Sequence, residues 1–298
     1  MTAKKETGAE PPLPPPIDPD SDTPREFHLT CATAAAALTL LAEATGLSRS
    51  AVKKAMNQGA VWWQRKDQVR RLRRADRQIN PGEQLHLYWN RQVLAETPEP
   101  AALIRDLDYI TVWNKPPGML SQGSRWGDHC TITRFAEQNL APQRSAYLVH
   151  RLDRLASGLM VIAHRKTTAR DLAQQFRLRE VEKRYVTWVK GKFPGDQPLT
   201  LDQPLDGKPA HSEVKLKRYD QPQERSQVEI TISTGRKHQI RRHLADAGWP
   251  LIGDPLYGDT NIDGKIPLNN HPFQLTACRL AFRDPVAGSA LEFVLPVT

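Results

Sequence analysis

Short β-branched runs dominate the chain after residue 102, and helical patterns separate only a few of them. Alternating or β-branched runs of this length predict strands. These runs lie at 109–113, 158–163, 183–191, 212–219, 226–233, and in the C-terminal segments LTACRLAF and LEFVLPV. Helical patterns are confined to 131–139, 167–178 and 237–247. Because strands outnumber helices and do not alternate with them regularly, this region predicts an α+β domain with a mixed, mainly antiparallel sheet.

The chain before residue 94 predicts a smaller α/β domain of its own. Residues 32–43, ATAAAALTLLAE, favour a helix that ends near Gly46. Ser48 is a suitable N-cap for a second helix over 49–58, which ends at Gly59. Two strands, AVWWQ and LHLYW, follow, and an NPGE turn precedes the second of them.

Two segments of low hydrophobicity divide the chain. Residues 1–25 are rich in proline and acidic side chains, a composition that predicts a disordered tail. Residues 94–101, LAETPEPA, contain two prolines and predict a linker. The expected organisation is therefore a tail (1–25), a small domain (26–93), a linker (94–101) and a larger domain (102–298).

Positive charge is concentrated in the small domain. The chain has a formal net charge of +9, and residues 49–77 alone carry ten Lys and Arg against Asp67 and Asp76. A focused basic patch of this kind is typical of a protein that binds a polyanion, although a well-solvated helix face is the simpler alternative. The side chains predicted to contact nucleic acid here are Arg49, Lys53, Lys54, Arg70, Arg71, Arg73 and Arg74.

Several classes of protein lack support in the sequence. It contains neither a P-loop pattern nor a GxGxxG after a strand, and no His, Cys, Asp and Glu set has metal-ligand spacing. Three widely separated cysteines, Cys31, Cys130 and Cys278, argue against a disulfide framework. No long apolar run or secretory signal is present. We therefore expect a cytoplasmic protein that uses no cofactor, metal or membrane.

Three charged segments that contain glycine loops remain as candidates for chemistry. They are HRLDRLASGL (150–159), EKRYV (182–186) and TGRKHQIRRHLADAGWPLIGDPLYG (234–258). In this order they resemble the signature motifs of the RluA-type pseudouridine synthases, and NKPPG (114–118) resembles the leading motif of that family. The resemblance covers residues 102–298 and implies the pseudouridine synthase fold. Separately, LSRSAVKKAMNQGAVWW and INPGEQLHLYW resemble the small RNA-binding domain named after ribosomal protein S-four.

The first resemblance implies a reaction in which a uridine base in RNA is detached, turned and reattached through a carbon, without a cofactor. By position, Asp153 is the catalytic aspartate, acting on either the ribose or the base. The resemblance assigns Arg241 as its charged partner, Tyr185 as the ring that packs against the target base, and Arg151 as the side chain that fills the space the base leaves. An opposite charge nearby would keep such a carboxylate ionised in a partly dry site. Taken singly, each residue has a structural alternative, such as a surface ion pair for Asp153.

The leading hypothesis is an isomerase that acts on structured RNA, with ribosomal RNA favoured, transfer RNA as a second possibility, and a monomeric protein expected. Two other functions stay open at this point. One is a non-catalytic RNA-binding or ribosome-assembly protein, and the other is an enzyme directed at DNA or nucleotides.

Overall fold

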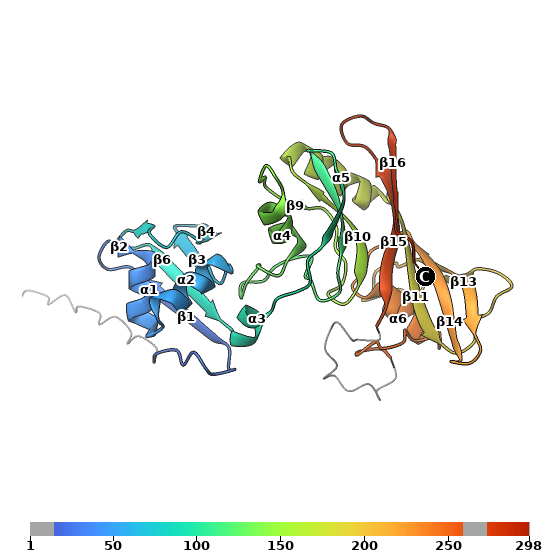
Figure 1. The fold of residues 1–298 in the computed structure, drawn as a ribbon, viewed down its shortest axis with the longest axis horizontal. Coiled ribbons are helices and arrows are strands. Elements are labelled where there is room, and N and C mark those ends of the chain that lie inside the picture. The colour runs from blue at the N-terminus through green and yellow to red at the C-terminus, as the bar shows by residue number, and fades with distance from the viewer. Residues whose placement is uncertain (1–14, 259–272, 298) are drawn as a thin grey trace, which may run out of the picture. The chain divides into compact units, whose positions relative to one another are not determined.

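The computed structural model describes residues 15–258 and 273–297 and divides the chain into two compact units (Figure 1). The first unit extends to Glu96 and also takes in Gly123–His129. The second covers Thr97–Gln122 and continues from Cys130. The inclusion of Gly123–His129 in the first unit differs from the contiguous division expected from composition. Local composition carries no signal for contacts between segments so far apart in the sequence.

The first unit is built on a four-stranded sheet with the order β1-β6-β3-β4. These strands are β1 (Arg25–Thr30), β3 (Val61–Arg65), β4 (Gln68–Arg71) and β6 (Gln84–Trp89). A separate pair is formed by β2 (Ala35–Ala36) and β5 (Gln78–Ile79). The helices are α1 (Ala37–Thr45), α2 (Arg49–Asn57) and α3 (Arg91–Ala95). Buried residues of α1, α2 and the sheet form one apolar core that includes Phe27, Leu41 and Met56. The likeness of this unit to the S-four domain remains a prediction.

The predicted caps Gly46 and Ser48 agree with the structure, whereas the first helix begins at Ala37 and not at Ala32, because Ala35–Ala36 form strand β2. The Ser48 hydroxyl accepts a hydrogen bond from the Ala51 amide at 3.2 Å, and Gly46 adopts the left-handed conformation after α1. Residues 15–25, however, differ from the expected disordered tail. Ile17 is buried in the core of the first unit, and Arg25 begins strand β1. The rest of the predicted tail, residues 1–14, lies outside the described residues.

The second unit contains a ten-stranded sheet, in which β12-β13-β14-β11-β15-β10-β8-β7 form the main path. The strands of this path are β7 (Ala102–Asp106), β8 (Ile110–Lys115), β10 (Ser157–Ala163), β11 (Glu182–Lys190), β12 (Leu199–Leu201), β13 (Ser212–Asp220), β14 (Arg225–Ile232) and β15 (Leu275–Arg283). Strand β9 (Tyr147–Leu148) pairs with β10, and β16 (Ala290–Val294) pairs with β15. Among the described strands, only β10 and β15 pair in parallel, which confirms the mixed, mainly antiparallel sheet.

Three helices pack with this sheet: α4 (Ile132–Asn139), α5 (Lys166–Leu178) and α6 (Gln239–Asp246). The central strand β10 is buried on both faces, because Met160 and Ile162 join one apolar cluster while Leu159 and Val161 join another.

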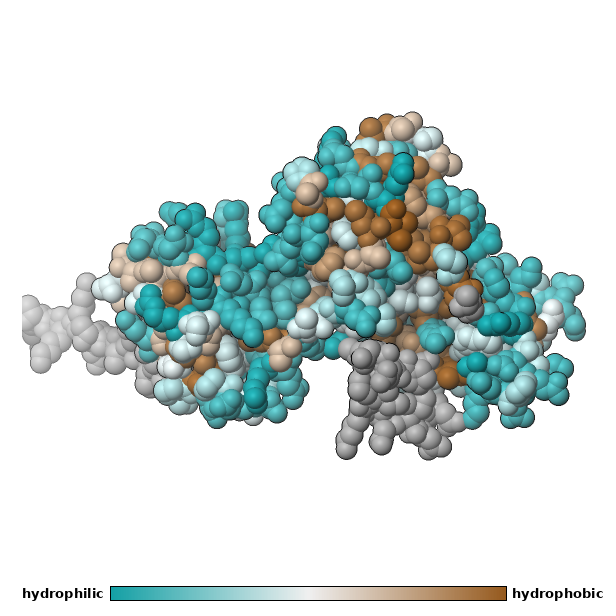
Figure 2. All heavy atoms as spheres, viewed as in Figure 1, coloured by the Kyte–Doolittle hydropathy of each residue, from teal (hydrophilic) through white to brown (hydrophobic). Residues whose placement is uncertain are grey.

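Figure 2 shows a mostly hydrophilic surface on the visible face of the first unit and a mixture of hydrophilic and hydrophobic residues on the second. Among the described helices, none is long and apolar enough to cross a membrane.

Candidate active site

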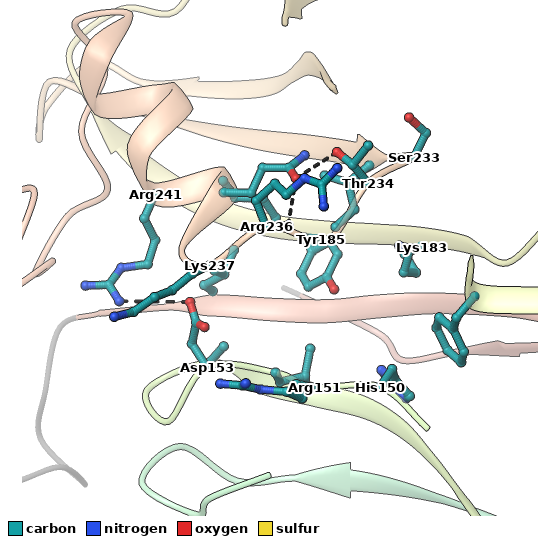
Figure 3. A pocket seen from close by; sticks show the side chains of 18 of the residues that line it. His150, Arg151, Asp153, Lys183, Tyr185, Ser233, Thr234, Arg236, Lys237 and Arg241 are labelled. Atoms are coloured by element: carbon teal, nitrogen blue, oxygen red, sulfur yellow. Dashed lines mark hydrogen bonds and ion pairs between the residues drawn. The ribbon is translucent and has the colours of Figure 1, made fainter. Parts of the chain in front are cut away.

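A cavity of about 710 Å³ in the second unit brings together three segments that are far apart in the sequence. Asp153 comes from the loop between β9 and β10, Tyr185 from the centre of β11, and Arg241 from α6. Asp153 and Tyr185 point into the same space, and Arg241 reaches Asp153 from the side (Figure 3). The three residues predicted to act together therefore line one cavity.

The loop that carries Asp153 is held by buried polar contacts on both sides of the carboxylate. The Ser121 hydroxyl donates to the Leu152 carbonyl at 2.7 Å and accepts from the Leu152 amide at 3.0 Å. The Gly118 amide donates to the Arg154 carbonyl at 2.8 Å. The residues on either side of Asp153 are thus tied by their main chain to the 118–121 segment.

The side chain of Lys115 also links the 116–119 segment to the loop that carries Asp153. Its ammonium is fully buried and donates to the carbonyls of Pro116 and Met119, both at 2.9 Å, and to that of Arg154 at 3.5 Å. Burial lowers the pKa of Lys115 to about 7, while the negative charge of Asp153 acts in the opposite direction. The NKPPG segment therefore has a structural part in the site, since it holds the aspartate loop through main-chain oxygens.

A glycine at the end of the loop allows β10 to approach β15. Gly158 has a φ of +110°, and a Cβ atom there would lie 2.3 Å from the Ala277 carbonyl oxygen. Gly158 pairs with Ala277, and the hydroxyls of Ser157 and Thr276 lie 3.0 Å apart. The close pairing of these two strands therefore requires glycine at position 158.

Arg241 is held mainly by a carboxylate other than Asp153. Its Nε and Nη2 donate to the two oxygens of Asp254 at 2.7 and 2.6 Å, and both side chains are almost completely buried. Its Nη1 lies 3.9 Å from Asp153. Arg241 therefore does lie beside Asp153, the partner that the resemblance assigns to it, but its two-pronged hydrogen bond is made with Asp254. Asp254 also accepts hydrogen bonds from the amides of Leu256 and Tyr257, so one buried carboxylate both shapes the turn and orients the guanidinium.

Aromatic rings enclose the same guanidinium. Its central carbon lies 5.0 Å from the ring centre of Tyr257 and 5.3 Å from that of Phe273. The Tyr257 hydroxyl lies 3.0 Å from Nδ1 of His238, which begins α6 in the left-handed conformation. With Nε and Nη2 bound by Asp254 and these rings close to its centre, Arg241 directs Nη1 toward Asp153.

Tyr185 is buried in the wall of the cavity opposite Asp153. Burial raises the pKa of its hydroxyl, and the negative charge of Asp153 adds to that effect. The pairing of β11 with β15 shifts register between Arg184 and Tyr185, and the unpaired residue, Cys278, is on β15, so the alternation of side chains along β11 is kept. The tyrosine thus offers a neutral aromatic face to whatever enters the cavity.

Comparison with known proteins places this geometry in a family. The family described as RNA pseudouridylate synthase matches residues 109–246, which include Asp153, Tyr185 and Arg241. The "Dual-specificity RNA pseudouridine synthase RluA" of Escherichia coli (strain K12) is 34% identical over 203 residues, which are 63% of this chain and 90% of that protein. The chain is an RluA-type RNA pseudouridine synthase. It is therefore an isomerase that converts uridine in RNA to pseudouridine.

Two further comparisons extend this result over the rest of the synthase. An "Uncharacterized RNA pseudouridine synthase" of Chloroflexus aurantiacus is 30% identical over 279 residues, with 84% of this chain and 82% of that protein covered. In structure, "Human RNA Pseudouridylate Synthase Domain Containing 1" matches with a TM-score of 0.56 at 20% identity, over 68% of this chain and 86% of that one. The structural match confirms the fold of the catalytic domain.

In this pseudouridine synthase, Arg151 lines the cavity and is exposed. Within the described residues its guanidinium forms no hydrogen bond or ion pair, so it is available to a ligand.

His150, which precedes Arg151, has a structural role instead. Its Nε2 accepts a hydrogen bond from the Val161 amide at 3.0 Å, and its ring stacks on Phe176. Burial, followed by the nearby charge of Lys183, lowers the pKa of His150 to about 3, so this histidine is neutral and structural.

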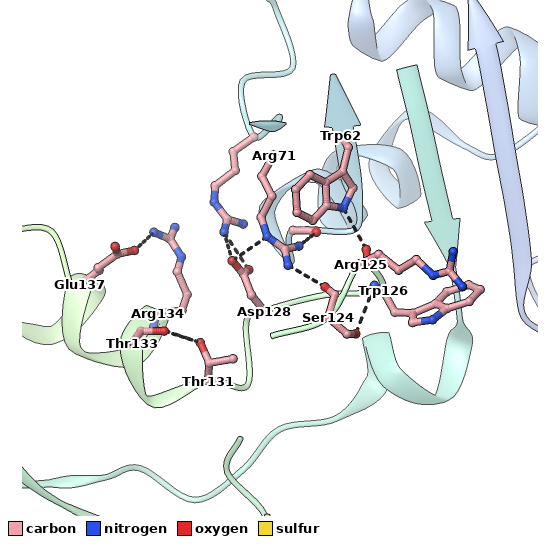
Figure 4. Close-up of polar contacts among 12 residues, drawn as sticks. Trp62, Arg71, Ser124, Arg125, Trp126, Asp128, Thr131, Thr133, Arg134 and Glu137 are labelled. Carbon is pink, nitrogen blue, oxygen red and sulfur yellow. Dashed lines mark hydrogen bonds and ion pairs between the residues drawn. The ribbon is translucent and has the colours of Figure 1, made fainter. Parts of the chain in front are cut away.

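Two of the arginines predicted to bind RNA have partners within the first unit, and Figure 4 shows those of Arg71. Arg71 donates to the carbonyls of Gly59 and Ser124, lies over the Trp62 ring at 4.3 Å, and is 3.2 Å from Asp128. Arg73 donates to the Asn57 carbonyl at 2.8 Å and lies 2.5 Å from Asp128. Both therefore hold the Gly123–His129 segment within the first unit. Charge counting could not separate them from their exposed neighbours.

The other basic residues predicted in the first unit remain exposed. Arg49, Lys53 and Lys54 lie on α2, whose buried side is formed by Val52, Ala55 and Met56. Arg70 and Arg74 are also exposed, and Arg74 lies 3.4 Å from Asp76. No cluster of three or more His, Cys, Asp or Glu side chains suited to a metal ion is found within 15–258 and 273–297.

Proposed function

We propose that this synthase isomerises a uridine in structured ribosomal RNA, with Asp153 as the reacting carboxylate. The observation that carries the proposal is the single cavity shared by Asp153, Arg241 and Tyr185. In the net reaction, the bond from the ribose to a ring nitrogen breaks and a bond to a ring carbon forms. The proton lost from that carbon is balanced by one gained on the nitrogen. Whether Asp153 attacks the ribose or the base is left open.

Each of the other two residues has a separate task in this proposal. Arg241, oriented by Asp254, places one positively charged nitrogen 3.9 Å from the Asp153 carboxylate. Tyr185 packs against the target base with its flat face. Arg151 occupies the space the base leaves when it turns out of its stack, a step that costs a few kcal/mol.

The charge of the cavity supports an RNA ligand. Among the residues that line it, seven are Lys or Arg, and Asp153 is the only Asp or Glu. The seven are Arg151, Arg177, Arg179, Lys183, Arg236, Lys237 and Arg241. Such an excess attracts the phosphate backbone of a nucleic acid and not a neutral nucleoside alone.

The preference for ribosomal RNA rests on the first unit and on one relative. The "Ribosomal large subunit pseudouridine synthase D" of Neisseria meningitidis serogroup A is 33% identical over 232 residues, with 68% of this chain and 60% of that protein covered. The name of the Escherichia coli relative, "Dual-specificity RNA pseudouridine synthase RluA", keeps transfer RNA as the second candidate. A cytoplasmic, monomeric enzyme without a cofactor completes the proposal.

The test is chemical mapping of pseudouridine in total RNA from cells with and without this gene. We expect at least one ribosomal RNA position to lose its modification and to regain it when the gene is restored. Loss confined to transfer RNA would overturn the choice of ribosomal RNA. An unchanged map, together with no pseudouridine formed by the purified enzyme on RNA from the deleted cells, would overturn the proposed activity.

The exposed face of α2 predicts a measurable part of the RNA affinity. Replacing Lys53 and Lys54 with Gln should weaken RNA binding and reduce the slope of log K against log salt by about 0.9 for each phosphate of a duplex region that the variant no longer neutralises. Both ammonium groups are exposed, so the free energy of unfolding should change little. Binding titrations at several salt concentrations check this.

The matched control is Arg91→Gln. Arg91 is also an exposed cation of the first unit, but it lies 3.8 Å from both Asp20 and Asp22. Its removal should leave the salt slope unchanged. If the Lys53→Gln/Lys54→Gln variant kept the slope of the unmodified enzyme, α2 would not contact RNA.

A further inference from the structure

One end of the cavity holds cations that the proposed reaction does not use. Lys183 lies near the start of β11, and Arg177 and Arg179 lie at the C-terminal end of α5. All three line the same cavity as Asp153 and Tyr185, together with Phe176. Figure 3 shows Lys183 beside Tyr185, on the side away from Arg241.

Lys183 is a partly buried cation that has no carboxylate partner among the described residues. It stands two positions before Tyr185 on the same strand, so both side chains point to the same face of the sheet. Within 15–258 and 273–297, its ammonium makes no hydrogen bond or ion pair, and it lies 6.0 Å from the centre of the Phe176 ring. Burial lowers its pKa. Because a buried charge is costly unless it is paired, an anionic partner from outside the chain would stabilise it.

The opposite face of the same strand shows the contrast. Glu182 and Arg184 alternate with Lys183 and Tyr185 along β11 and therefore point the other way. Arg184 lies 2.7 Å from Glu182 and 3.6 Å from Glu229. The cation on this outer face is thus neutralised by neighbouring carboxylates.

The two arginines of α5 resemble Lys183 in having no carboxylate partner. Arg177 and Arg179 are exposed, and in the described part of the chain their guanidinium groups form no hydrogen bond or ion pair. Glu180, which follows them in the sequence, is not among the residues that line the cavity. Three cations therefore face one end of the cavity without compensation.

The neighbouring aromatic pair adds no charge to this end. His150 and Phe176 stack with ring centres 4.5 Å apart and an angle of 17° between their planes. The Nε2 of His150 is already used by the Val161 amide, so the imidazole offers that nitrogen to no ligand. A ligand at this end therefore meets cations and an apolar wall, which suits a phosphodiester lying against a base or sugar.

We propose that Lys183, with Arg177 and Arg179, binds an RNA backbone phosphate adjacent to the uridine whose base packs on Tyr185. Lys183 and Tyr185 are about 7 Å apart along the strand. One nucleotide can therefore contact both, with its base on the tyrosine and a flanking phosphate on the lysine. The site deepens the proposed function and rests on it, because it needs the target nucleotide in the cavity. Its role is to fix the register of the RNA, so that one uridine of the strand reaches Asp153.

The test measures binding of a short RNA substrate to Lys183→Gln in an Asp153→Asn background, which prevents turnover. We expect the Kd to rise about tenfold or more, as for the loss of a charged hydrogen bond. The slope of log K against log salt should fall by about 0.7 for one single-stranded phosphate contact. Arg184→Gln, on the same strand but the opposite face, is the matched control and should retain both values.

A second measurement locates the phosphate. Each phosphate of the short RNA is replaced in turn by an uncharged methylphosphonate. Substitution of one phosphate next to the target uridine should weaken binding to the Asp153→Asn protein. The same substitution should not weaken binding to the Asp153→Asn/Lys183→Gln protein any further. The Arg177→Gln/Arg179→Gln variant should lower the slope as well, and it carries the test by itself if Lys183→Gln fails to fold.

The outcomes separate this proposal from the proposed function. If the lysine variant and the double arginine variant both keep the unmodified Kd and salt slope, the phosphate site is wrong, even if the enzyme forms pseudouridine. If the methylphosphonate effect persists without Lys183, the phosphate is bound elsewhere. The absence of pseudouridine from reactions of the unsubstituted enzyme would instead overturn the proposed function.

Discussion

We expect the Asp153→Asn enzyme to form no measurable pseudouridine and to bind the same RNA with nearly unchanged affinity. Asparagine has the shape of aspartate but no negative charge, and it is a poor nucleophile. Loss of a group that reacts covalently with substrate lowers turnover by at least about 10⁴-fold. Asp153 is a single anion among seven cations of the cavity, so its removal should not weaken the attraction of RNA. Single-turnover conversion, quantified by mass spectrometry of digested RNA, provides the measurement.

A matched control separates chemistry from general damage. Asp246→Asn makes the same substitution at an exposed position of α6 outside the cavity lining, and it should retain full activity. The thermal unfolding of both variants should stay close to that of the unmodified enzyme. An Asp153→Asn enzyme with normal turnover would remove Asp153 from the reaction. The same variant with normal RNA binding and no loss of cellular function would favour the non-catalytic RNA-binding alternative.

The second large effect is expected at Asp254, which does not touch the substrate in this proposal. Replacing it with Ala leaves the Arg241 guanidinium buried without its two strongest hydrogen bonds. Breaking a buried ion pair by removing one partner costs about 3–5 kcal/mol of stability. The amides of Leu256 and Tyr257 lose an acceptor in addition. Denaturant unfolding should therefore show a marked decrease in the free energy of unfolding, and kcat should fall because Arg241 no longer holds its orientation.

A double-mutant cycle identifies the cause. Arg241→Met alone leaves the Asp254 carboxylate buried without its ion-pair partner, whereas Arg241→Met with Asp254→Ala removes both charges. The double variant should therefore lose less free energy of unfolding than the sum of the losses in the two single variants. The control is Asp206→Asn, which removes the exposed partner of Arg242, the next residue of α6, at 3.0 Å. That change should leave the free energy of unfolding nearly unchanged, because an exposed ion pair contributes little to stability. Purely additive effects of Arg241 and Asp254 would contradict the coupling.

Much of the secondary structure of both units could be predicted because its signals are local. Alternation of apolar residues determines which segments become strands, and the caps Ser48 and Gly46 mark helix ends through their own backbone chemistry. Strand β1 was missed because REFHLT offers few branched apolar residues and adjoins the proline-rich segment. In the same way, Ile17 gave no local sign that it would pack into the core of the first unit.

Contacts between distant segments could not be predicted in this way. Asp128 is 55 residues from Arg73, and no local pattern distinguishes arginines that will meet a carboxylate from those that remain exposed. Only the folded arrangement of the first unit shows that Arg71 and Arg73 are structural. The same limit applies to Lys183, because its lack of a partner is a property of the space around it.

The sequence by itself determined the class of fold and the family, and it predicted that Asp153, Tyr185 and Arg241, which line one cavity, act together. Motif order and residue type are properties of the chain itself, and no coordinates are needed to compare them. Only the tertiary structure decided which carboxylate holds Arg241. An ion pair depends on which side chains meet in a buried space, and Asp254 approaches with both oxygens while Asp153 remains at 3.9 Å. Because Arg241 binds Asp254 with two of its nitrogens and approaches Asp153 only with the third, Asp153 lies beside a positive charge and stays open to the cavity.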